Sequence, residues 1–463
     1  MLDRKLTSFP DKRLVTRGNE ILTALFRKST HSIRQLTSSD AEAKGFYRFL
    51  WNDRITEENI LSNMTSNCIH ASQGRFVVCI QDTSEVNLST HSNRLKTKEK
   101  LGTTNASNER GLGFFLHPSL VLDAETSMPY GFATVKLWHR PSEFKTKFER
   151  KYNTLPIEEK ESYKWIETSQ KTKEVLQESV QGMVIIQDRE GDIYEQFATI
   201  PDGKTDLLIR SSTNRTLKDK SKLFDSLENT PAAGHYLIEV VAKEQRKSRT
   251  AKIEVRYKEV ELPRTKGSSI ELPNSTKLYL IEAKEVDYDG KDHICWRLLT
   301  TVPVISIEVA RLCIEWYSWR WQIEEVFRIV KNEGYAIESS ELEYPESIRK
   351  FTLLILETVI RLFLMRFAYS HPEHDVPASH CFNEDEIAFL ERQICAQEGK
   401  TAKQKNPYTS KDLKRYVWSI ARLGGWKGNE SNRNPGITTL WIGIRLFSAS
   451  YQGWLLHKDV STR

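Results

Sequence analysis

The stretches RFVVCIQDTSEV (75–86) and GMVIIQDREGD (182–192) decide the fold. Each is an apolar run that ends in the dipeptide Gln-Asp, at Asp82 and at Asp188, before the chain enters a turn. Short, continuous apolar runs indicate strands that are buried on both faces, as in α/β proteins. Ligand groups in open α/β sheets lie at the carboxyl ends of strands, so both aspartates are candidate site residues. Either one could instead be a turn former or a helix cap.

The rest of the sequence predicts several regions around these strands. Residues 1 to about 70 have the apolar spacing of helices, and Ser39 is the expected N-cap of one of them. Residues 112–140 indicate two further strands joined by a turn. From about 211 to 300 the apolar residues alternate with period two, which predicts an antiparallel β insertion. Residues 371–463 combine a polar stretch with helical segments, so the predicted fold class is α/β with helical regions at both ends.

The composition favours a polyanionic partner. The chain has 463 residues, of which 28% are charged, and a formal net charge of +6. Its eleven tryptophans and sixteen tyrosines are many, and aromatic rings beside bases suit stacking on nucleic acid. Most of these aromatic side chains must nevertheless lie in the core.

Other classes of protein are not expected. The six cysteines form no CxxC pair, a pattern typical of reduced thiols in the cytoplasm and not of a zinc site or a disulfide framework. The N-terminus has no apolar signal region. The most apolar stretch, residues 351–370, carries Glu357, Arg361 and Arg366, so a buried helix is expected there and not a membrane span.

A third candidate carboxylate lies in YSWRWQIEEVFRIVKNEG (317–334). Apolar residues recur there at helical spacing without a proline, so we predict a single helix that ends near Asn332. At about 100° per residue, a phenol, two bases and one acid fall on one stripe beside the apolar face. A charged helix face is usually only solvated, so the stripe matters only if the rest of the chain supplies partners for the acid. The four residues are Tyr317, Arg320, Glu324 and Lys331.

Asp82, Asp188 and Glu324 form a candidate metal-binding set. Three carboxylates from separate elements can hold two Mg²⁺ ions about 3.5–4 Å apart, and such a pair promotes in-line phosphoryl displacement. Hard oxygen ligands suit Mg²⁺, with Mn²⁺ as a substitute, better than zinc. The three residues are far apart in the sequence, so their meeting is a prediction about the tertiary structure.

These residues resemble the signature of a known family. The spacing Y-x2-R-x3-E-x6-K, which begins at Tyr317, is similar to the Y-R-E-K signature of bacterial insertion-sequence transposases in the DDE, or retroviral-integrase-like, superfamily. DREGDIYE (188–195) resembles the second-aspartate motif of that group, and QDTS (81–84) resembles its first. The resemblance covers nearly the whole chain. It is closest for the cut-and-paste subgroup, which excises its element through DNA hairpins.

The resemblance implies a fold and a division of the chain. The core would be RNase H-like, with Asp82, Asp188 and Glu324 as the catalytic, metal-binding triad. The chain would divide into a helical DNA-end-binding domain (1–70), a catalytic domain with its β insertion at about 211–300 (71–370), and a helical dimerisation domain (371–463).

The resemblance also implies residues that contact DNA. Tyr317, Arg320 and Lys331 would hold phosphates near the cleaved end, because bases neutralise phosphate and a phenol adds a hydrogen bond. Trp296 would stack on a base that is flipped out beside the transposon end, and Trp321 is a second candidate for stacking. Either tryptophan could instead be a packing residue.

Four further residues carry weaker expectations. Arg210, at the end of a short strand, would contact a DNA phosphate, with a salt bridge to an acid as the alternative. His117 and Lys164 match family positions, but His117 is expected to be a buried strand residue and not a catalytic base. Asp192 is expected to cap a helix and not to bind metal.

The expected function is that of a DNA transposase. It would bind the terminal inverted repeats of its insertion sequence, cleave both strands through a nick and a hairpin, and join the 3′ ends to target DNA with Mg²⁺ as cofactor. Its partners would be double-stranded DNA and a second copy of the chain, in the cytoplasm at the bacterial nucleoid and without a membrane. The alternative is a non-catalytic, dimerising inhibitor of transposition, against which the complete triad argues.

Overall fold

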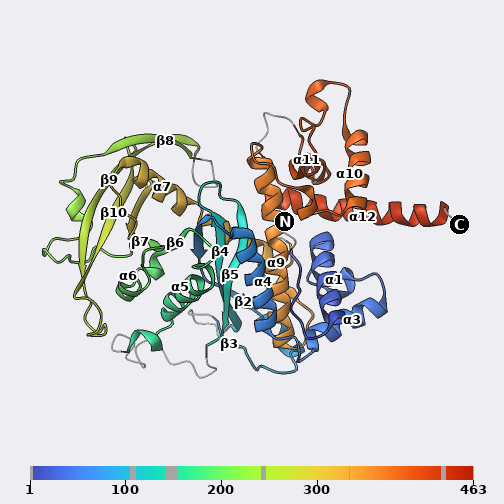
Figure 1. The fold of residues 1–463 in the computed structure, drawn as a ribbon, viewed down its shortest axis with the longest axis horizontal. Helices are drawn as coiled ribbons and strands as arrows, with labels where there is room; N and C mark the ends of the chain where they lie inside the picture. Colours follow the sequence, from blue (N-terminus) through green and yellow to red (C-terminus); the bar gives the residue numbers. More distant parts are fainter. Residues whose placement is uncertain are drawn as a thin grey trace.

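The computed structural model describes residues 4–104, 111–140, 155–240, 247–332, 334–428 and 434–461. A large mixed sheet lies on one side of the molecule, and helices from both ends of the chain gather on the other side around the long helix α9 (Figure 1). The predicted α/β fold class with helical regions at both ends is therefore confirmed.

Four helices precede the sheet, and side-chain caps set where they begin. The side chain of Asp11 accepts a hydrogen bond from the Arg13 amide, and Ser39 accepts one from the Glu42 amide, as the sequence predicts for Ser39. Thr56 forms a capping box at the start of the fourth helix. The bounds are α1 Lys12–Lys28, α2 Ile33–Leu36, α3 Asp40–Trp51 and α4 Glu57–Ser72.

The first seven strands build one part of the sheet. β1 is parallel to β6, and β6 is parallel to β7, whereas β4 is antiparallel to both β1 and β5. The resulting order β5-β4-β1-β6-β7 is the one expected of an RNase H-like core. The bounds are β1 Phe76–Gln81, β2 Ser84–Asn87, β3 Gly102–Thr103, β4 Leu112–Asp123, β5 Pro129–Trp138, β6 Gly182–Gln187 and β7 Thr205–Arg210.

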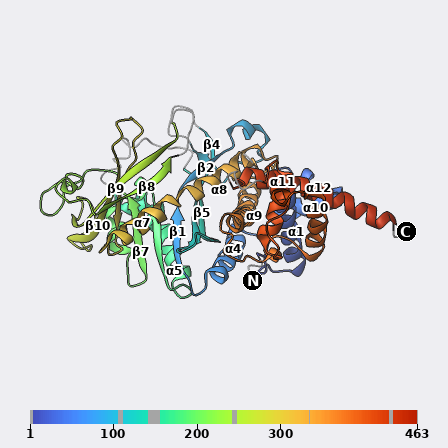
Figure 2. The same cartoon turned by 90° about the horizontal axis from the view of Figure 1, so that it is seen from above.

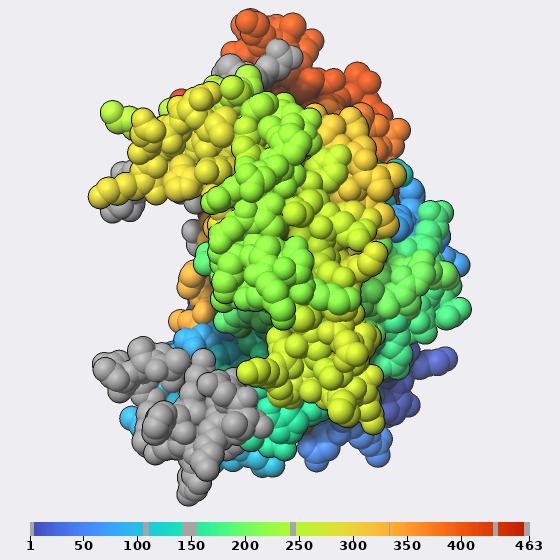
Figure 3. All heavy atoms as spheres, turned by 90° about the vertical axis from the view of Figure 1, so that its left-hand side faces the viewer, coloured from blue at the N-terminus to red at the C-terminus, as the bar shows by residue number. Residues whose placement is uncertain are grey.

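The strands of the insertion continue this sheet. β11 pairs antiparallel with β7, with Leu298 opposite Arg210, and β10, β9 and β8 follow in turn. The insertion therefore lengthens the sheet on the β7 side, and its green-to-yellow residues cover one face of the molecule (Figure 3). The bounds are β8 Gly234–Val240, β9 Arg249–Pro263, β10 Ser275–Val286 and β11 Cys295–Thr300.

Helices cover the sheet and lead back to the helical side. α5 packs on β4 and β5, and α4 and α9 also pack on β5. α7 and α8 follow one another from the sheet toward α9 (Figure 2), and α8 packs against α9. α9 is buried along most of its length, yet no helix in the described residues is long and apolar enough to cross a membrane. The bounds are α5 Tyr163–Leu176, α6 Tyr194–Thr199, α7 Ile307–Ser318, α8 Trp321–Lys331 and α9 Pro345–Ser370.

Three C-terminal helices pack on the helices that surround α9. α11 contacts α9, α10 and α12, while α12 also contacts α1 and α9. The first and last helices therefore contact each other on the helical side, whereas the C-terminal end of α12 projects away from the molecule (Figure 1). The bounds are α10 Glu384–Gln397, α11 Leu413–Leu423 and α12 Ile437–Ser461.

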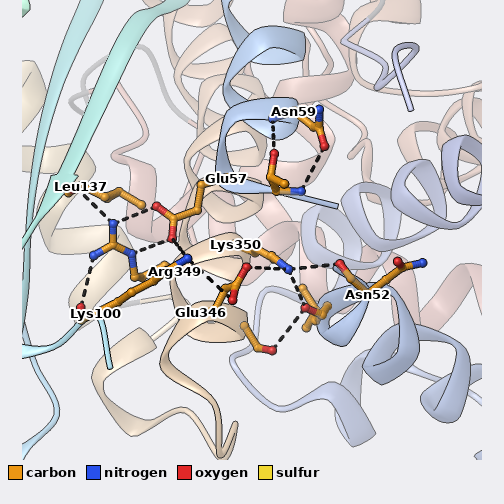
Figure 4. A network of polar contacts seen from close by, with 11 residues as sticks. Asn52, Glu57, Asn59, Lys100, Leu137, Glu346, Arg349 and Lys350 are labelled. Atoms are coloured by element: carbon orange, nitrogen blue, oxygen red, sulfur yellow. Dashed lines mark hydrogen bonds and ion pairs between the residues drawn. The ribbon is translucent and has the colours of Figure 1, made fainter. Parts of the chain in front are cut away.

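Polar contacts fix the N-terminal helices to α9. The Arg349 guanidinium donates two hydrogen bonds of 2.8 Å to the Glu57 carboxylate at the start of α4 (Figure 4). The buried Lys350 ammonium donates to the carbonyl oxygens of Leu50 and Asn52, at the end of α3. Because α9 also packs on α8, these contacts connect the N-terminal helices to the helix that carries Glu324.

Candidate active site

The two strand-ending aspartates lie side by side at one edge of the sheet. β1 and β6 are neighbouring parallel strands, and Asp82 and Asp188 directly follow their last residues. The Asp82 carboxylate accepts a hydrogen bond of 2.8 Å from the Thr83 amide. Asp188 caps the short 3₁₀ turn Arg189–Gly191 and accepts a hydrogen bond of 2.8 Å from the Glu190 amide. The predicted meeting of these two carboxylates therefore follows from the strand order.

Glu324 reaches the same edge from α8. The Arg320 guanidinium donates a hydrogen bond of 2.8 Å to the Asp82 carboxylate and a second, shorter one to the Glu324 carboxylate. All three side chains are largely withdrawn from solvent, with exposed fractions of 14% for Arg320, 17% for Asp82 and 33% for Glu324. One arginine thus joins the first and third members of the predicted triad.

The aspartates lie in an environment that disfavours their charge. Burial and the nearby charge of Asp188 together raise the pKa of Asp82 to about 7, and Arg320 opposes the shift. Burial also raises the pKa of Asp188, although the hydrogen bond from the Glu190 amide opposes the shift. Carboxylates that are held together despite burial and mutual repulsion are typical of functional sites that receive a cation.

The donor set fits a hard divalent cation. Asp82, Asp188 and Glu324 offer only carboxylate oxygens, and the charges of the other two raise the pKa of Asp82. In the described residues no three acidic, histidine or cysteine side chains already stand at metal-binding distance from one another. Arg320 supplies the positive charge between Asp82 and Glu324, so a cation that uses both carboxylates has to displace this guanidinium.

Three of the predicted DNA-contact residues meet beside the carboxylates. Tyr317 is buried at the end of α7, and its ring lies edge-on to the half-buried Trp296 ring of β11, with centroids 5.3 Å apart. Burial raises the pKa of Tyr317, whereas Arg320 and Arg210 lower it, which places both guanidinium groups near the phenol. Arg210 ends β7, next to the strand that ends at Asp188.

Two other predicted DNA-contact residues, Trp321 and Lys331, are the first and last residues of α8. The Trp321 side chain is 54% exposed, and the Arg320 guanidinium lies 5.7 Å from the centre of its ring. Lys331 is the last residue of α8, where its ammonium pairs with Glu338 at 3.4 Å. Lys331 lies about two helical turns beyond Glu324 and has its own acidic partner.

The prediction of one helix over residues 317–334 is wrong at its start. α7 ends at Ser318, and α8 begins at Trp321. Between them the amides of Arg320, Gln322 and Ile323 bond to the carbonyl oxygens three residues earlier, which is the tighter 3₁₀ pattern. Tyr317 therefore lies on α7 and points into the core, and only the later residues of the predicted stripe share α8. The predicted stop near Asn332 is confirmed.

The prediction that Asp192 caps a helix is also wrong. α6 begins at Tyr194 without a side-chain cap. The Asp192 side chain is fully buried, pairs with Arg215 and accepts a hydrogen bond of 2.8 Å from the Ser212 amide. Asp192 therefore anchors the loop after β7 to the turn that holds Asp188.

His117 and Thr83 support Asp82. His117 is fully buried, and its Nδ1 lies 2.8 Å from the Thr83 hydroxyl. Burial lowers the pKa of His117 well below its ordinary value. His117 is a buried strand residue as expected, but its Nε2 has no hydrogen-bond partner in the described structure, so it is only partly satisfied. The sequence pattern indicated no role for Thr83. Its position directly after Asp82 is the feature from which a supporting role could have been predicted. Lys164 pairs with Glu190 at 3.2 Å, in the turn after Asp188.

Comparisons with known proteins found two family models and a solved structure to which the chain is similar. The family model described as "Transposase DNA-binding" matches residues 5–55, and the model described as "Transposase DDE domain" matches residues 167–358, which include Asp188 and Glu324. Among solved structures, the chain is similar to the piggyBac transposase in a cryo-EM synaptic complex with hairpin DNA. That similarity has 10% sequence identity and a TM-score of 0.36, and it covers 89% of this chain and 81% of that chain. Residues 5–55 and 167–358 thus carry the DNA-binding and DDE domains of a transposase, an enzyme that transfers polynucleotide strands.

Proposed function

We propose that the protein is the cut-and-paste transposase of a bacterial insertion sequence with the Y-R-E-K signature. It recognises the terminal inverted repeats of its element, excises the element through hairpin intermediates and joins the 3′ ends to target DNA. The observation that carries the proposal is the convergence of Asp82, Asp188 and Glu324 with Arg320, beside the Tyr317–Trp296 pair.

In this proposal the carboxylates hold the cofactor and the bases hold the DNA. Asp82, Asp188 and Glu324 bind Mg²⁺ or Mn²⁺, which when bound activates the attacking oxygen and stabilises the leaving oxygen. Arg320 exchanges its two carboxylate partners for a phosphate of the cleaved end, since a guanidinium binds either anion with two hydrogen bonds. Lys331 and Arg210 contact further phosphates.

The strand steps are four in-line displacements at phosphorus, two hydrolyses by water and two transesterifications by a 3′-hydroxyl. Water cleaves one strand and leaves a 3′-hydroxyl at the end of the element. That hydroxyl attacks the opposite strand, which closes a hairpin and releases the flanking DNA. Water then opens the hairpin, and the regenerated 3′-hydroxyl attacks target DNA. Trp296 stacks on the base that leaves the helix when the hairpin closes, and the exposed Trp321 ring is the second stacking surface.

The division of labour along the chain is part of the proposal. Residues 1–70 bind the DNA ends, residues 71–370 with the insertion at about 211–300 cleave them, and residues 371–463 bring two protomers together in the synaptic complex at the nucleoid. The match of a transposase DNA-binding family to residues 5–55 supports the first assignment.

The test is cleavage of DNA that carries the inverted repeats flanking the gene. The protein is incubated with this DNA and Mg²⁺, and the strands are separated on denaturing gels. Nicks at the element ends, followed by hairpins and then opened ends, are the expected products. Binding and pairing of the ends without cleavage, even with Mn²⁺, would refute the proposal and leave the non-catalytic inhibitor.

Substitution of Trp296 should separate nicking from hairpin formation. Because the ring packs against Tyr317 at the surface of the site, we expect Trp296→Ala to nick near the wild-type rate and to form hairpins about five- to 150-fold more slowly. The loss corresponds to base stacking of about 1–3 kcal/mol. Time courses on denaturing gels measure both products. Equal loss of nicks and hairpins in Trp296→Ala would contradict the assigned role.

Metal binding should depend on pH through Asp82. The pKa of this carboxyl is raised to about 7, so below pH 7 a proton competes with the cation for the same oxygen. We expect the apparent affinity for Mn²⁺ to rise by roughly tenfold per pH unit up to about pH 7 and to level off above it. Mn²⁺ titrations at pH 6, 7 and 8 measure this affinity. In Asp82→Asn the affinity should no longer change with pH in this way. Equal wild-type affinities at pH 6 and pH 8 would contradict it.

A further inference from the structure

Two glutamines form a buried contact directly beneath the candidate catalytic aspartates. Gln81 and Gln187 are the last residues of β1 and β6, and neither has any solvent-exposed surface. The Gln187 side-chain amide donates a hydrogen bond of 2.8 Å to the side-chain oxygen of Gln81. Each glutamine is bonded through the chain to the aspartate that follows it, so this contact joins the bases of Asp82 and Asp188.

The glutamine contact lies directly after the last backbone pair between the two strands. The last paired residues of β1 and β6 are Ile80 and Ile186. The bond between Gln187 and Gln81 connects the same strands one residue further on. It connects β1 directly to β6 next to the aspartates, where the backbone of each glutamine pairs only with the strand on its other side, Gln81 with Ser119 and Gln187 with Ile209.

Two helices complete the cluster. The Ser169 hydroxyl of α5 lies 3.0 Å from the Gln187 side-chain nitrogen, and the Gln196 amide of α6 donates to the Gln187 side-chain oxygen at 2.5 Å. Gln196 also donates to the carbonyl oxygen of Gly191 at 3.1 Å, in the turn that Asp188 caps. The cluster thus holds both strand ends and the turn after Asp188.

Gly191 leaves the room that this cluster needs. A Cβ atom at Gly191 would lie 2.2 Å from the Gln187 side-chain oxygen, so any other residue would push the amide away. The turn Arg189–Gly191 therefore packs directly on Gln187, and a displacement of the amide would reach Asp188 through the turn as well as through the strand.

The cluster is not what an optimally stable core would contain. The residues before Gln81 and Gln187 in both strands are buried and apolar, apart from the exposed Phe76 and the glycine at the start of β6. The Gln81 side-chain nitrogen is buried and has no hydrogen-bond partner in the described structure. A buried donor without a partner lowers stability, and an apolar side chain of similar shape would avoid that loss. Directional hydrogen bonds between the strand ends supply what an apolar side chain cannot, which is a fixed separation.

We infer that Gln81, Gln187 and Gln196 are positioning residues that set the spacing and orientation of Asp82 and Asp188 for the divalent cation. The inference rests on the proposed function, because it assigns these aspartates to metal binding. The glutamines act through the strand ends and the Gly191 turn and do not touch the DNA. Groups that orient metal ligands typically change metal affinity or activity by about ten- to a hundredfold when they are removed.

The experiment compares stability with metal binding in the full-length chain. Gln187→Met removes the central amide and keeps the length of the side chain, and Gly191→Ala displaces that amide without changing the strands. Thr172→Val is the matched control, because Thr172 is a buried polar residue of α5 whose hydroxyl has no partner in the described structure. Mn²⁺ affinity, the rate of nicking and the melting temperature are measured for each protein.

We expect Gln187→Met and Gly191→Ala each to bind Mn²⁺ and to nick DNA about ten- to a hundredfold less well than wild type. Gln187→Met should melt lower than Thr172→Val, because it leaves the buried side chains of Gln81 and Gln196 without their partner. A merely structural role would lower the melting temperature and leave the Mn²⁺ affinity of the folded protein unchanged. If Gly191→Ala acts through Gln187, the double variant should be no worse than the single variants. If Gln187→Met does not fold, Gly191→Ala alone decides the question through its Mn²⁺ affinity.

Two results would overturn the inference. Wild-type Mn²⁺ affinity in both variants, together with wild-type nicking, would show that the glutamines do not position the aspartates. The second result is a wild-type protein that binds Mn²⁺ no more tightly than Asp188→Asn does. In that case the proposed function fails as well. The two failures are distinguishable because the first leaves the wild-type signal intact.

Discussion

Asp188→Asn should bind DNA that carries the terminal repeats as tightly as wild type and cleave it at least about a thousandfold more slowly. Asp188 is one of three carboxylates that offer oxygen ligands at the edge of the sheet, and a bound cation contributes several kcal/mol to stabilising a phosphoryl-transfer transition state. Each 1.36 kcal/mol lost is a tenfold loss in rate. The side chain of asparagine retains an oxygen that can accept the hydrogen bond from the Glu190 amide, so the turn after β6 should keep its shape.

The matched control is Asp202→Asn. Asp202 also caps a turn, with hydrogen bonds of 2.8 Å from the amides of Lys204 and Thr205, but it precedes β7, whose far end carries Arg210. Single-turnover nicking and DNA-binding assays measure both variants. Cleavage by Asp188→Asn at the rate of Asp202→Asn would remove Asp188 from the catalytic set.

Glu357→Ala should strongly destabilise the folded protein. The Glu357 carboxylate is 1% exposed, pairs with the 3% exposed Arg4 at 3.0 Å and accepts a hydrogen bond of 2.9 Å from Asn67. Its removal leaves the Arg4 charge buried between the chain start and α9, which typically costs about 3–5 kcal/mol. Thermal and denaturant unfolding, followed by circular dichroism, measure the loss.

Two other variants test the cause of this loss. Glu174→Ala removes the carboxylate of an exposed ion pair, that of Lys171 with Glu174, and should change stability by at most about 0.5 kcal/mol. The double variant Arg4→Met, Glu357→Leu removes both charges and should recover much of the stability that Glu357→Ala loses, because no unpaired charge stays buried. Equal melting temperatures for Glu357→Ala and Glu174→Ala would contradict this explanation.

Much of the catalytic sheet could be predicted because its strands form from short, local sequence patterns. The strands that end at Asp82 and Asp188 are continuous apolar runs, and burial on both faces of a sheet selects such runs directly. The N-cap Ser39 and the helix end near Asn332 follow from hydrogen bonds between near neighbours. Such features depend on few residues, so a single sequence is enough to place them.

The errors lie where distant residues decide the local structure. The helix predicted over 317–334 is broken by a 3₁₀ turn, and Tyr317 turns into the core against Trp296. Helical periodicity alone does not predict this turn, because Trp319 and Arg320 within it keep right-handed helical dihedral angles. Asp192 has the sequence position of a cap, but Arg215 and the Ser212 amide, some twenty residues later, take its carboxylate.

The sequence by itself determined the chemistry that this protein can perform. The order of Asp82, Asp188 and Glu324 and the spacing from Tyr317 to Lys331 were enough to indicate a DDE transposase, and the family matches agree. Only the tertiary structure decided how these groups meet. The parallel pairing of β1 with β6 sets the two aspartates side by side, Arg320 bridges to Glu324, and buried glutamines join the strand ends. The reason is physical: residue types fix which bonds are possible, whereas distances between residues more than a hundred positions apart depend on strand order and on packing.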